Sequence, residues 1–250
     1  MRLFTNLELS AAATLSTELD EHLEACHEIL PLIEDCVAVA VALPESSSAV
    51  RLRVGASLLI RLAQEIRGTL LLNTFGYPTQ ATSIVAGAFE TAYTVAYIRD
   101  IDDRARSWLG HDDPTRPYKR VKLLIRDVLQ RHGIDDEQVD AHYRIYQQLC
   151  LAKHGNPLFA QDHSFQQENG KTVVTIGPNT SEAGIRAAEF SLVSVPGLAT
   201  VAIRSFLADY VGNAKSDLEK RLMNLETKWT ALHEQGSQRW GTEDPFPGKW

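Results

Sequence analysis

One carboxylate, Glu90, is the residue most able to do chemistry, because it is the only charge between Ser83 and Ile98. On a helical wheel, apolar side chains cover most of this segment, and Glu90 falls in a narrow sector with Gly87 and Thr94. A helix this apolar is expected to pack on several sides in a protein core. A carboxylate there must be paired, hydrogen-bonded or protonated, because an unpaired buried charge is costly. Glu90 therefore indicates either a functional site or a structural ion pair.

Two residues elsewhere in the chain are candidate partners for Glu90. Arg67 shares a face of the preceding predicted helix with Ile60, Ala63 and Leu71, so it is a possible partner for Glu90 across the helix pair. His154 continues an inward-pointing stripe of a later helix. An arginine, a glutamate and a histidine that meet in a helical core could hold an anion and move a proton. The alternative is a buried ion pair that fixes helix register, with His154 at a helix end.

The helix of Glu90 also carries two tyrosines, Tyr93 and Tyr97. Ligand pockets combine aromatic walls with a few polar groups that orient the ligand. A third interpretation is therefore a small-ligand pocket around Glu90, with Tyr93 and Tyr97 as ligand-binding residues.

The elements that must position these residues are helices, and the pattern predicts an all-α fold: a multi-helix bundle with long antiparallel helices. We expect one helical domain over residues 1–235 and a surface tail over 236–250. Asn169-Gly170, between two strand-like runs, predicts one small β-hairpin insertion at about residues 162–177. Helices are predicted over residues 11–43, with a kink or break at Pro31, and over 49–73, 79–98, 102–109, 118–131, 135–153, 181–212 and 214–234.

The composition is that of a large globular protein. The 250 residues are 44% hydrophobic and 23% charged, and the net charge of -7 does not favour nucleic acid or acidic membranes as general partners. Three cysteines are typical of a reducing compartment. Early acidic residues argue against a signal peptide, and apolar runs are interrupted before a membrane-spanning length. We therefore expect a cytoplasmic protein that does not enter a membrane.

Motifs for metals and cofactors are weak. His22, Cys26 and His27 are not followed by a second group of ligands at a metal-binding spacing. The sequence has no Walker loop, dinucleotide fingerprint or Gly-x-Ser-x-Gly elbow. We therefore expect neither a metal nor a cofactor.

A basic segment lies ahead of and within the helix predicted over residues 118–131. It could hold a phosphate backbone, or it could be a solvated helix face balanced by neighbouring acids. The acidic balance of the whole chain favours the solvated face. The basic residues are Arg116, Lys119, Arg120, Lys122 and Arg126.

Several short motifs together resemble a known group of proteins. They are the Phe89-Glu90 pair, the run from Tyr143 to Pro157 that ends in Lys-His-Gly-Asn-Pro, and Gly177-Pro178 after the predicted hairpin. This pattern resembles bacterial all-helical domains of unknown function. It is also distantly similar to the HEPN superfamily, which includes ribonucleases of toxin and phage-defence systems.

HEPN ribonucleases carry an arginine, usually followed by a polar residue, and then a histidine a few positions on. Arg126 and His132 match that spacing here, and Arg104 and His111 match it more loosely. The resemblance therefore implies Arg126 and His132 as candidate catalytic residues acting on RNA. His154 has no arginine at the required distance.

Three functions remain open from the sequence. The first is protein association, as a homodimer or with a protein partner. The second is a HEPN-like ribonuclease, which would use Arg126 and His132 or a spatial set of Arg67, Glu90 and His154; RNA is a partner only in this case. The third is small-ligand binding around Glu90.

Overall fold

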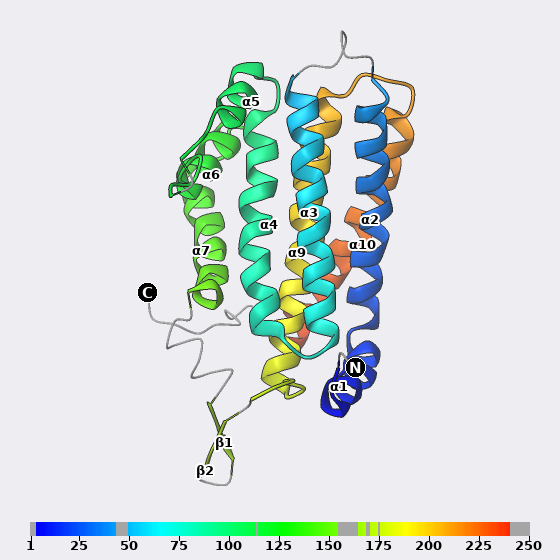
Figure 1. The fold of residues 1–250 in the computed structure, drawn as a ribbon, viewed down its shortest axis with the longest axis vertical. Helices are drawn as coiled ribbons and strands as arrows, with labels where there is room; N and C mark the ends of the chain where they lie inside the picture. Colours follow the sequence, from blue (N-terminus) through cyan, green and yellow to red (C-terminus); the bar gives the residue numbers. More distant parts are fainter. Residues whose placement is uncertain are drawn as a thin grey trace.

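The computed structural model describes residues 4–43, 50–113, 115–154, 165–168, 171–174 and 176–240. Long helices pack side by side in a bundle, with α1 at an angle to the end of α2 (Figure 1). The predicted all-α bundle is therefore confirmed. The helices are α1 (Asn6–Glu18), α2 (Asp20–Val41), α3 (Val50–Thr74), α4 (Pro78–Ile98), α5 (Asp102–Leu109), α6 (Val121–Gln130), α7 (Asp136–Lys153), α9 (Glu182–Asp209) and α10 (Lys215–Trp240).

Two short strands lie between α7 and α9 in the chain. Strand β1 (Phe165–Glu168) pairs antiparallel with β2 (Lys171–Val174), and Phe165 stands opposite Val174. The residues at the predicted turn, Asn169 and Gly170, lie outside the described residues.

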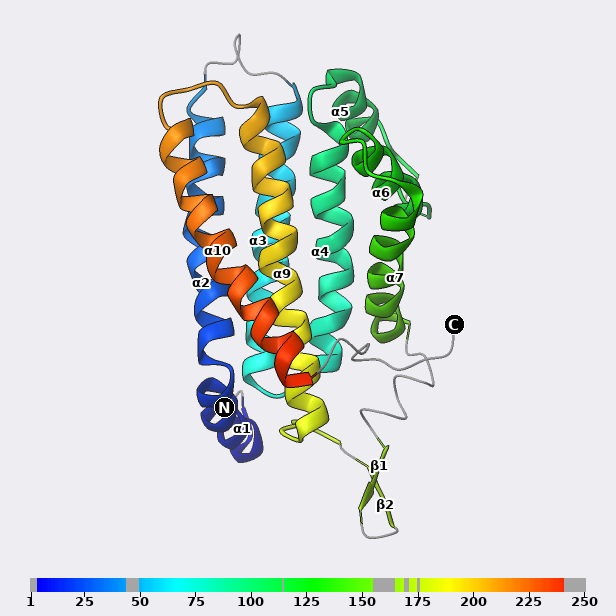
Figure 2. The ribbon, with the colours of Figure 1, turned by 180° about the vertical axis from the view of Figure 1, so that it is seen from behind.

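Helix α4 is the centre of the bundle. Helices α3 and α9 pack on one side of it, and α6 and α7 cover the other (Figure 1, Figure 2). Fifteen of its 21 residues are buried, and five of these are alanines. Small side chains let neighbouring helices approach closely, which explains how one helix accommodates neighbours on nearly every side. The short connection from Thr74 to Pro78 makes α3 and α4 the predicted antiparallel pair.

The break in the first predicted helix lies at a different residue from the one expected. The chain turns at Leu19, which is fully buried between α1 and α2, whereas Pro31 is inside α2. Burial of Leu19 against the core offsets the interruption of the backbone ladder, and α2 absorbs the proline. At the other end of the chain, α10 continues to Trp240, beyond the predicted end at Glu234.

Helix α9 also contains a proline, Pro196, and the chain supplies substitutes for the hydrogen bond that it removes. A proline has no N–H, so the carbonyl of Leu192, four residues earlier, has no helical partner. The thiol of Cys26 donates to this carbonyl at 3.3 Å. The indole of Trp229 donates to the neighbouring carbonyl of Val193 at 2.6 Å. These bonds join α9 to α2 and to α10.

By length and apolar composition, α9 would also be able to cross a membrane, and it alone among the described helices meets that test. Within the bundle, 72% of its most apolar window is buried. Helices α2, α3, α4 and α10 pack against it, so its apolar surface is covered by protein. This burial is what the core helix of a bundle requires.

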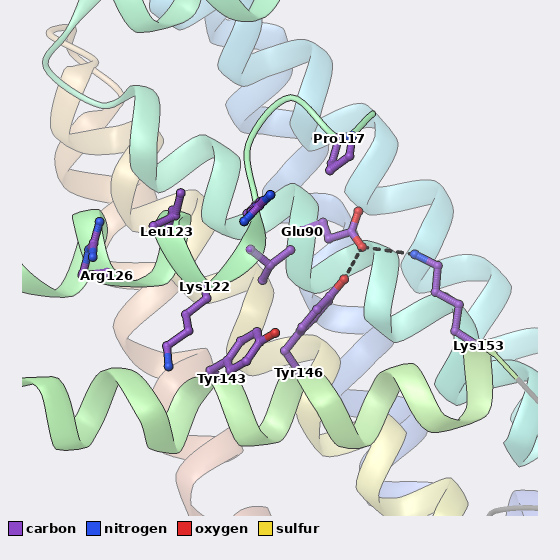
Figure 3. A pocket seen from close by; sticks show the side chains of 10 residues that line it. Glu90, Pro117, Lys122, Leu123, Arg126, Tyr143, Tyr146 and Lys153 are labelled. Atoms are coloured by element: carbon purple, nitrogen blue, oxygen red, sulfur yellow. Dashed lines mark hydrogen bonds and ion pairs between the residues drawn. The ribbon is translucent and has the colours of Figure 1, made fainter. Parts of the chain in front are cut away.

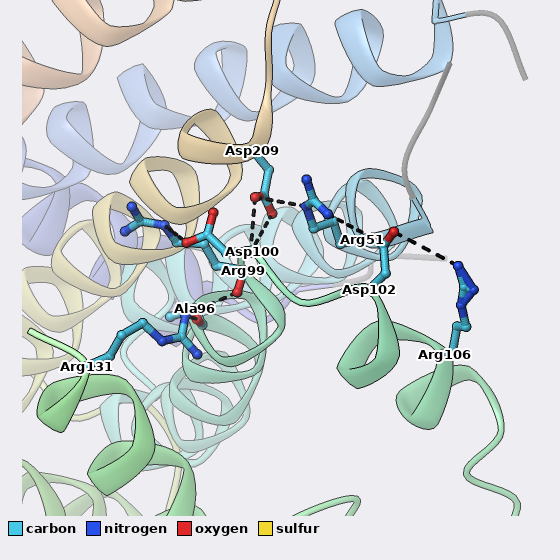
Figure 4. A network of polar contacts seen from close by, with 8 residues as sticks. All are labelled: Arg51, Ala96, Arg99, Asp100, Asp102, Arg106, Arg131 and Asp209. Atoms are coloured by element: carbon cyan, nitrogen blue, oxygen red, sulfur yellow. Dashed lines mark hydrogen bonds and ion pairs between the residues drawn. The ribbon is translucent and has the colours of Figure 1, made fainter. Parts of the chain in front are cut away.

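The C-terminal end of α4 is closed by a guanidinium. Arg131, just after α6, donates to the carbonyls of Ala96, Tyr97 and Arg99 at 3.2, 3.0 and 3.2 Å (Figure 4). The last carbonyls of a helix have no partner within the helix and need an outside donor. Arg131 therefore ties the end of α6 to the end of α4.

A second set of contacts joins the adjacent ends of α3, α5 and α9. Arg51 pairs with Asp209 and with Asp102, each at 3.0 Å (Figure 4). Asp209 also accepts a hydrogen bond of 3.1 Å from the backbone N–H of Asp100, which has a positive φ of 63°. These bonds hold the sharp turn after α4 that sends the chain into α5.

We predict that Arg131→Ala destabilises the fold by about 1–3 kcal/mol, because it leaves partly buried carbonyls without a donor. Urea unfolding followed by circular dichroism measures the change. Arg116→Ala is the matched control, since the Arg116 side chain is 81% exposed, and a surface change of this kind stays within about 0.5 kcal/mol. Equal unfolding free energies for the two variants would contradict the capping role.

Candidate functional site

A cavity of about 650 Å³ lies beside Glu90, between α4, α6 and α7. The segment before α6 completes its wall with Pro117, seen next to Glu90 in Figure 3. This size is in the range of small-molecule sites. The residues that line the cavity are Glu90, Pro117, Arg120, Val121, Lys122, Leu123, Arg126, Tyr143, Tyr146 and Lys153.

The carboxylate of Glu90 is held by two donors from α7. The phenol of Tyr146 donates to Oε1 at 2.7 Å, and the ammonium of Lys153 donates to the same oxygen at 3.1 Å (Figure 3). Glu90 is therefore paired and hydrogen-bonded, and its side chain is 29% exposed. The cavity opens over the polar sector of α4, and an ion pair this exposed fixes geometry more than it adds stability.

Arg67 does not reach Glu90. It lies on the outer face of α3 and pairs with Glu34 of α2 at 2.5 Å. The prediction was wrong because Ile60 and Leu71, two of the three apolar residues on its face, are themselves exposed, although Ala63 is buried. The face that they mark points to solvent and not to α4.

His154 does not reach Glu90 either. It is exposed and follows Lys153, the last residue of α7. Lys153, the residue before His154, faces α4 and binds Glu90. Because successive residues of a helix point about 100° apart, His154 points in a different direction. The predicted cluster of Arg67, Glu90 and His154 is therefore wrong, and Tyr146 and Lys153 take the places of the two partners.

Tyr93 and Tyr97 do not line the cavity. Tyr93 is buried, and its hydroxyl is hydrogen-bonded to Nδ1 of His142. Tyr97 is also buried; its hydroxyl accepts from Lys119 at 3.1 Å, and Arg104 stacks 4.1 Å from its ring centre. Both hydroxyls are used within the protein, and ligand binding by Tyr93 and Tyr97 stays a prediction from the sequence.

The aromatic wall comes instead from α7, through Tyr143 and Tyr146, whose ring centres lie 6.2 Å apart. Residues three and seven apart on a helix share a face. Tyr143, Tyr146 and Lys153 follow this spacing, so a stripe of cavity residues was visible in the sequence. What the sequence did not contain was the identity of the facing helix.

Arg126 and His132 are not brought together in this cavity. Arg126 lines it from α6 and is 49% exposed. His132 is exposed and lies beyond the last residue of α6, Gln130, outside the cavity lining. The formal match to an arginine–histidine spacing therefore does not produce a joint site.

Positive charge gathers where the first turn of α6 meets the cavity. Arg120, Lys122 and Arg126 line this end, and Lys122 also pairs with Asp140 at 2.8 Å. In the described structure no side chain caps the N-terminus of α6, whose N-cap is Arg120. The free N–H groups and the dipole of a helix N-terminus favour an anion. The predicted basic segment therefore supplies both surface ion pairs and one end of the cavity.

A second carboxylate, Glu65 of α3, lies behind Glu90. Its Oε1 pairs with Arg61 at 3.0 Å and accepts from Thr91 at 3.4 Å, and its side chain is 13% exposed. It fits because the residue opposite is Gly87, where a Cβ would lie 2.9 Å from Oε1. Burial, and to a smaller degree the charge of Glu90, raises the pKa of Glu65 above its usual value.

We predict that Glu65 makes the stability of the protein depend on pH. A raised folded-state pKa means that the fold favours the protonated carboxyl of Glu65. The stability that this proton contributes is complete below pH 4.5, the ordinary pKa of the group. It is lost as the pH rises through the folded-state pKa. Glu65→Gln should therefore gain stability relative to wild type as the pH rises from 4.5. Urea unfolding across this range measures the difference, and a constant difference would contradict the assignment.

No metal site is formed by the ionisable residues. Across the described parts of the chain, no three histidine, cysteine, aspartate or glutamate side chains are grouped to hold a metal ion. Cys26 is fully buried, and burial raises the pKa of its thiol. His22 is buried one turn earlier, and burial lowers the pKa of its imidazole.

Comparison with known proteins adds no assignment. No family model, no curated protein and no solved structure matches this chain. The resemblance to HEPN proteins stays a prediction from short motifs.

Proposed function

We propose that this protein binds a small organic anion in the cavity beside Glu90. The observation that carries the proposal is the lining itself, which sets four cations, Arg120, Lys122, Arg126 and Lys153, against one carboxylate. Lys153 is occupied by Glu90 and Lys122 by Asp140. Arg120 lies at the start of α6, and Arg126 lies in the second turn with Asp127 as a partner at 4.0 Å. An anionic group would find guanidinium donors and backbone N–H groups on this helix.

The walls of the cavity suit an organic ligand better than an inorganic ion. Tyr143 and Tyr146 contribute aromatic surface, and Pro117, Val121 and Leu123 contribute apolar surface. Pockets of this kind bury the body of a ligand and orient it through a few polar groups. Burial of apolar ligand surface adds roughly 25 cal/mol per Å² to the binding free energy that the charged contacts supply.

The ribonuclease and association hypotheses draw less support. His132 lies outside the cavity that Arg126 lines, and no histidine of the described residues lines that cavity. Exposed apolar residues such as Leu7, Val41 and Val211 also lie outside it, so association through them would use a different surface. Homodimer formation, a protein partner and a cytoplasmic location stay predictions from the sequence.

A thermal-shift panel tests the proposal. Organic phosphates, carboxylates, alkylammonium ions and neutral analogues are added to the full chain at matched ionic strength. At a concentration of 100 times Kd, a ligand stabilises the fold by about 2.7 kcal/mol. We expect one or more organic anions to raise the melting temperature and the cations to leave it unchanged.

The double variant Arg120→Ala/Arg126→Ala should weaken binding of the anion found in this panel by at least about 100-fold, since each of the two lost charged hydrogen bonds contributes about 1.5–3 kcal/mol. Arg116→Ala/Arg144→Ala removes the same charge from exposed positions outside the cavity and is the matched control. Titration calorimetry measures both. Unchanged affinity in the first variant, or an equal loss in both, would place the anion elsewhere.

A further inference from the structure

A second cavity, of about 400 Å³, adjoins the first. Three residues, Glu90, Pro117 and Val121, line both cavities. Glu90 rises from α4 between the two, and Pro117 belongs to the segment that leads into α6. The two spaces therefore form one site with two compartments that meet at the Glu90 carboxylate.

The second compartment differs in chemistry from the first. It is bounded by α3, α4, α5, α6 and the segment before α6, and Trp108 and Leu109 give it an aromatic and apolar wall. Its two cations, Arg61 and Lys119, are already paired, with Glu65 at 3.0 Å and with Asp127 at 2.7 Å. The His111 and Tyr118 rings add a further wall, with their centres 5.9 Å apart in a T-shaped arrangement. Such surfaces bind a flat ring by burial and by edge or face contact.

The junction carries a hydrogen-bond acceptor. Both donors that the described residues give to Glu90, from Tyr146 and Lys153, use Oε1. The other oxygen, Oε2, points toward Pro117 (Figure 3), the residue shared by both compartments. Since Lys153 already balances the charge of Glu90, a neutral N–H is enough to satisfy Oε2.

We propose that the ligand is an elongated N-acylated amino acid or a close analogue that spans both compartments. Its acidic end lies against Arg120 and Arg126, its amide N–H donates to Oε2 of Glu90, and its acyl group carries a flat ring that packs beside Trp108. This inference rests on the proposed anion binding and adds the class of the ligand. The order along the ligand follows from the pairing of the cations. Arg61 and Lys119 of the second compartment are paired with Glu65 and Asp127, whereas Arg120 lines only the first compartment and Trp108 only the second.

Three probes separate the parts of this ligand. The first, 2-naphthoylglycine, has all three groups; N-acetylglycine lacks the ring; and 2-naphthoyloxyacetate replaces the amide N–H with an ester oxygen. Titration calorimetry on the full chain should give 2-naphthoylglycine an affinity at least tenfold higher than either of the others. The phosphonate analogue of 2-naphthoylglycine shows whether a carboxylate or a phosphonate is the better acidic end.

Two variants connect the preferences to residues. Trp108→Leu should remove the advantage of the naphthoyl ring and leave binding of N-acetylglycine unchanged, whereas Trp108→Phe should keep most of it. In Glu90→Gln, Tyr146 and Lys153 hold the amide oxygen at the Oε1 position, so the NH₂ group replaces Oε2. The NH₂ group, a donor, then faces the N–H of the ligand. The preference for 2-naphthoylglycine over the ester 2-naphthoyloxyacetate should therefore disappear. Unchanged circular dichroism spectra establish that each variant is folded.

The outcomes distinguish the two proposals. If organic anions bind but 2-naphthoylglycine gains nothing over N-acetylglycine, or if Trp108→Leu and Glu90→Gln leave the preferences intact, the two-compartment ligand is wrong and anion binding stands. If no organic anion of the panel and none of these probes binds, both proposals fail.

Discussion

The packing of α4 is the constraint on which the rest of the structure depends. A helix surrounded on nearly every side must be narrow and almost free of charge, and α4 meets this condition through its alanines. Its one charged side chain, Glu90, then has to find partners in whichever layer covers it. Helices α6 and α7 form that layer, and α7 supplies both Tyr146 and Lys153. The packing of α4 therefore determines both the architecture of the bundle and the position of the candidate site.

The layer of α6 and α7 is attached to α4 at several places. Arg131 binds the carbonyls at the C-terminal end of α4, His142 is hydrogen-bonded to Tyr93, and Lys153 binds Glu90 nearer the middle. The cavity lies beside the last of these contacts. Residues of three helices and one loop surround it, so the site depends on the tertiary fold more than on any local motif.

The sequence was sufficient to predict where the helices lie along the chain, but not which helices pack against each other. The apolar periodicity placed both ends of α3 within one residue of the observed bounds, because burial dictates that pattern. It misassigned Arg67, since Ile60 and Leu71 mark an exposed face that looks the same as a buried one in a list of residues. It also singled out His154 in place of Lys153. A pattern along one helix gives the angle of a side chain and not the helix that it meets.

The contact between Gly87 and Glu65 has a consequence for how this sequence can vary. A methyl group at position 87 would lie 2.9 Å from the Glu65 carboxylate, so any larger residue there requires a shorter or displaced side chain on α3. The two positions belong to different helices and are 22 residues apart, yet each limits the other. A larger residue at position 87 would therefore displace the Glu65 carboxylate and with it the contact to Arg61.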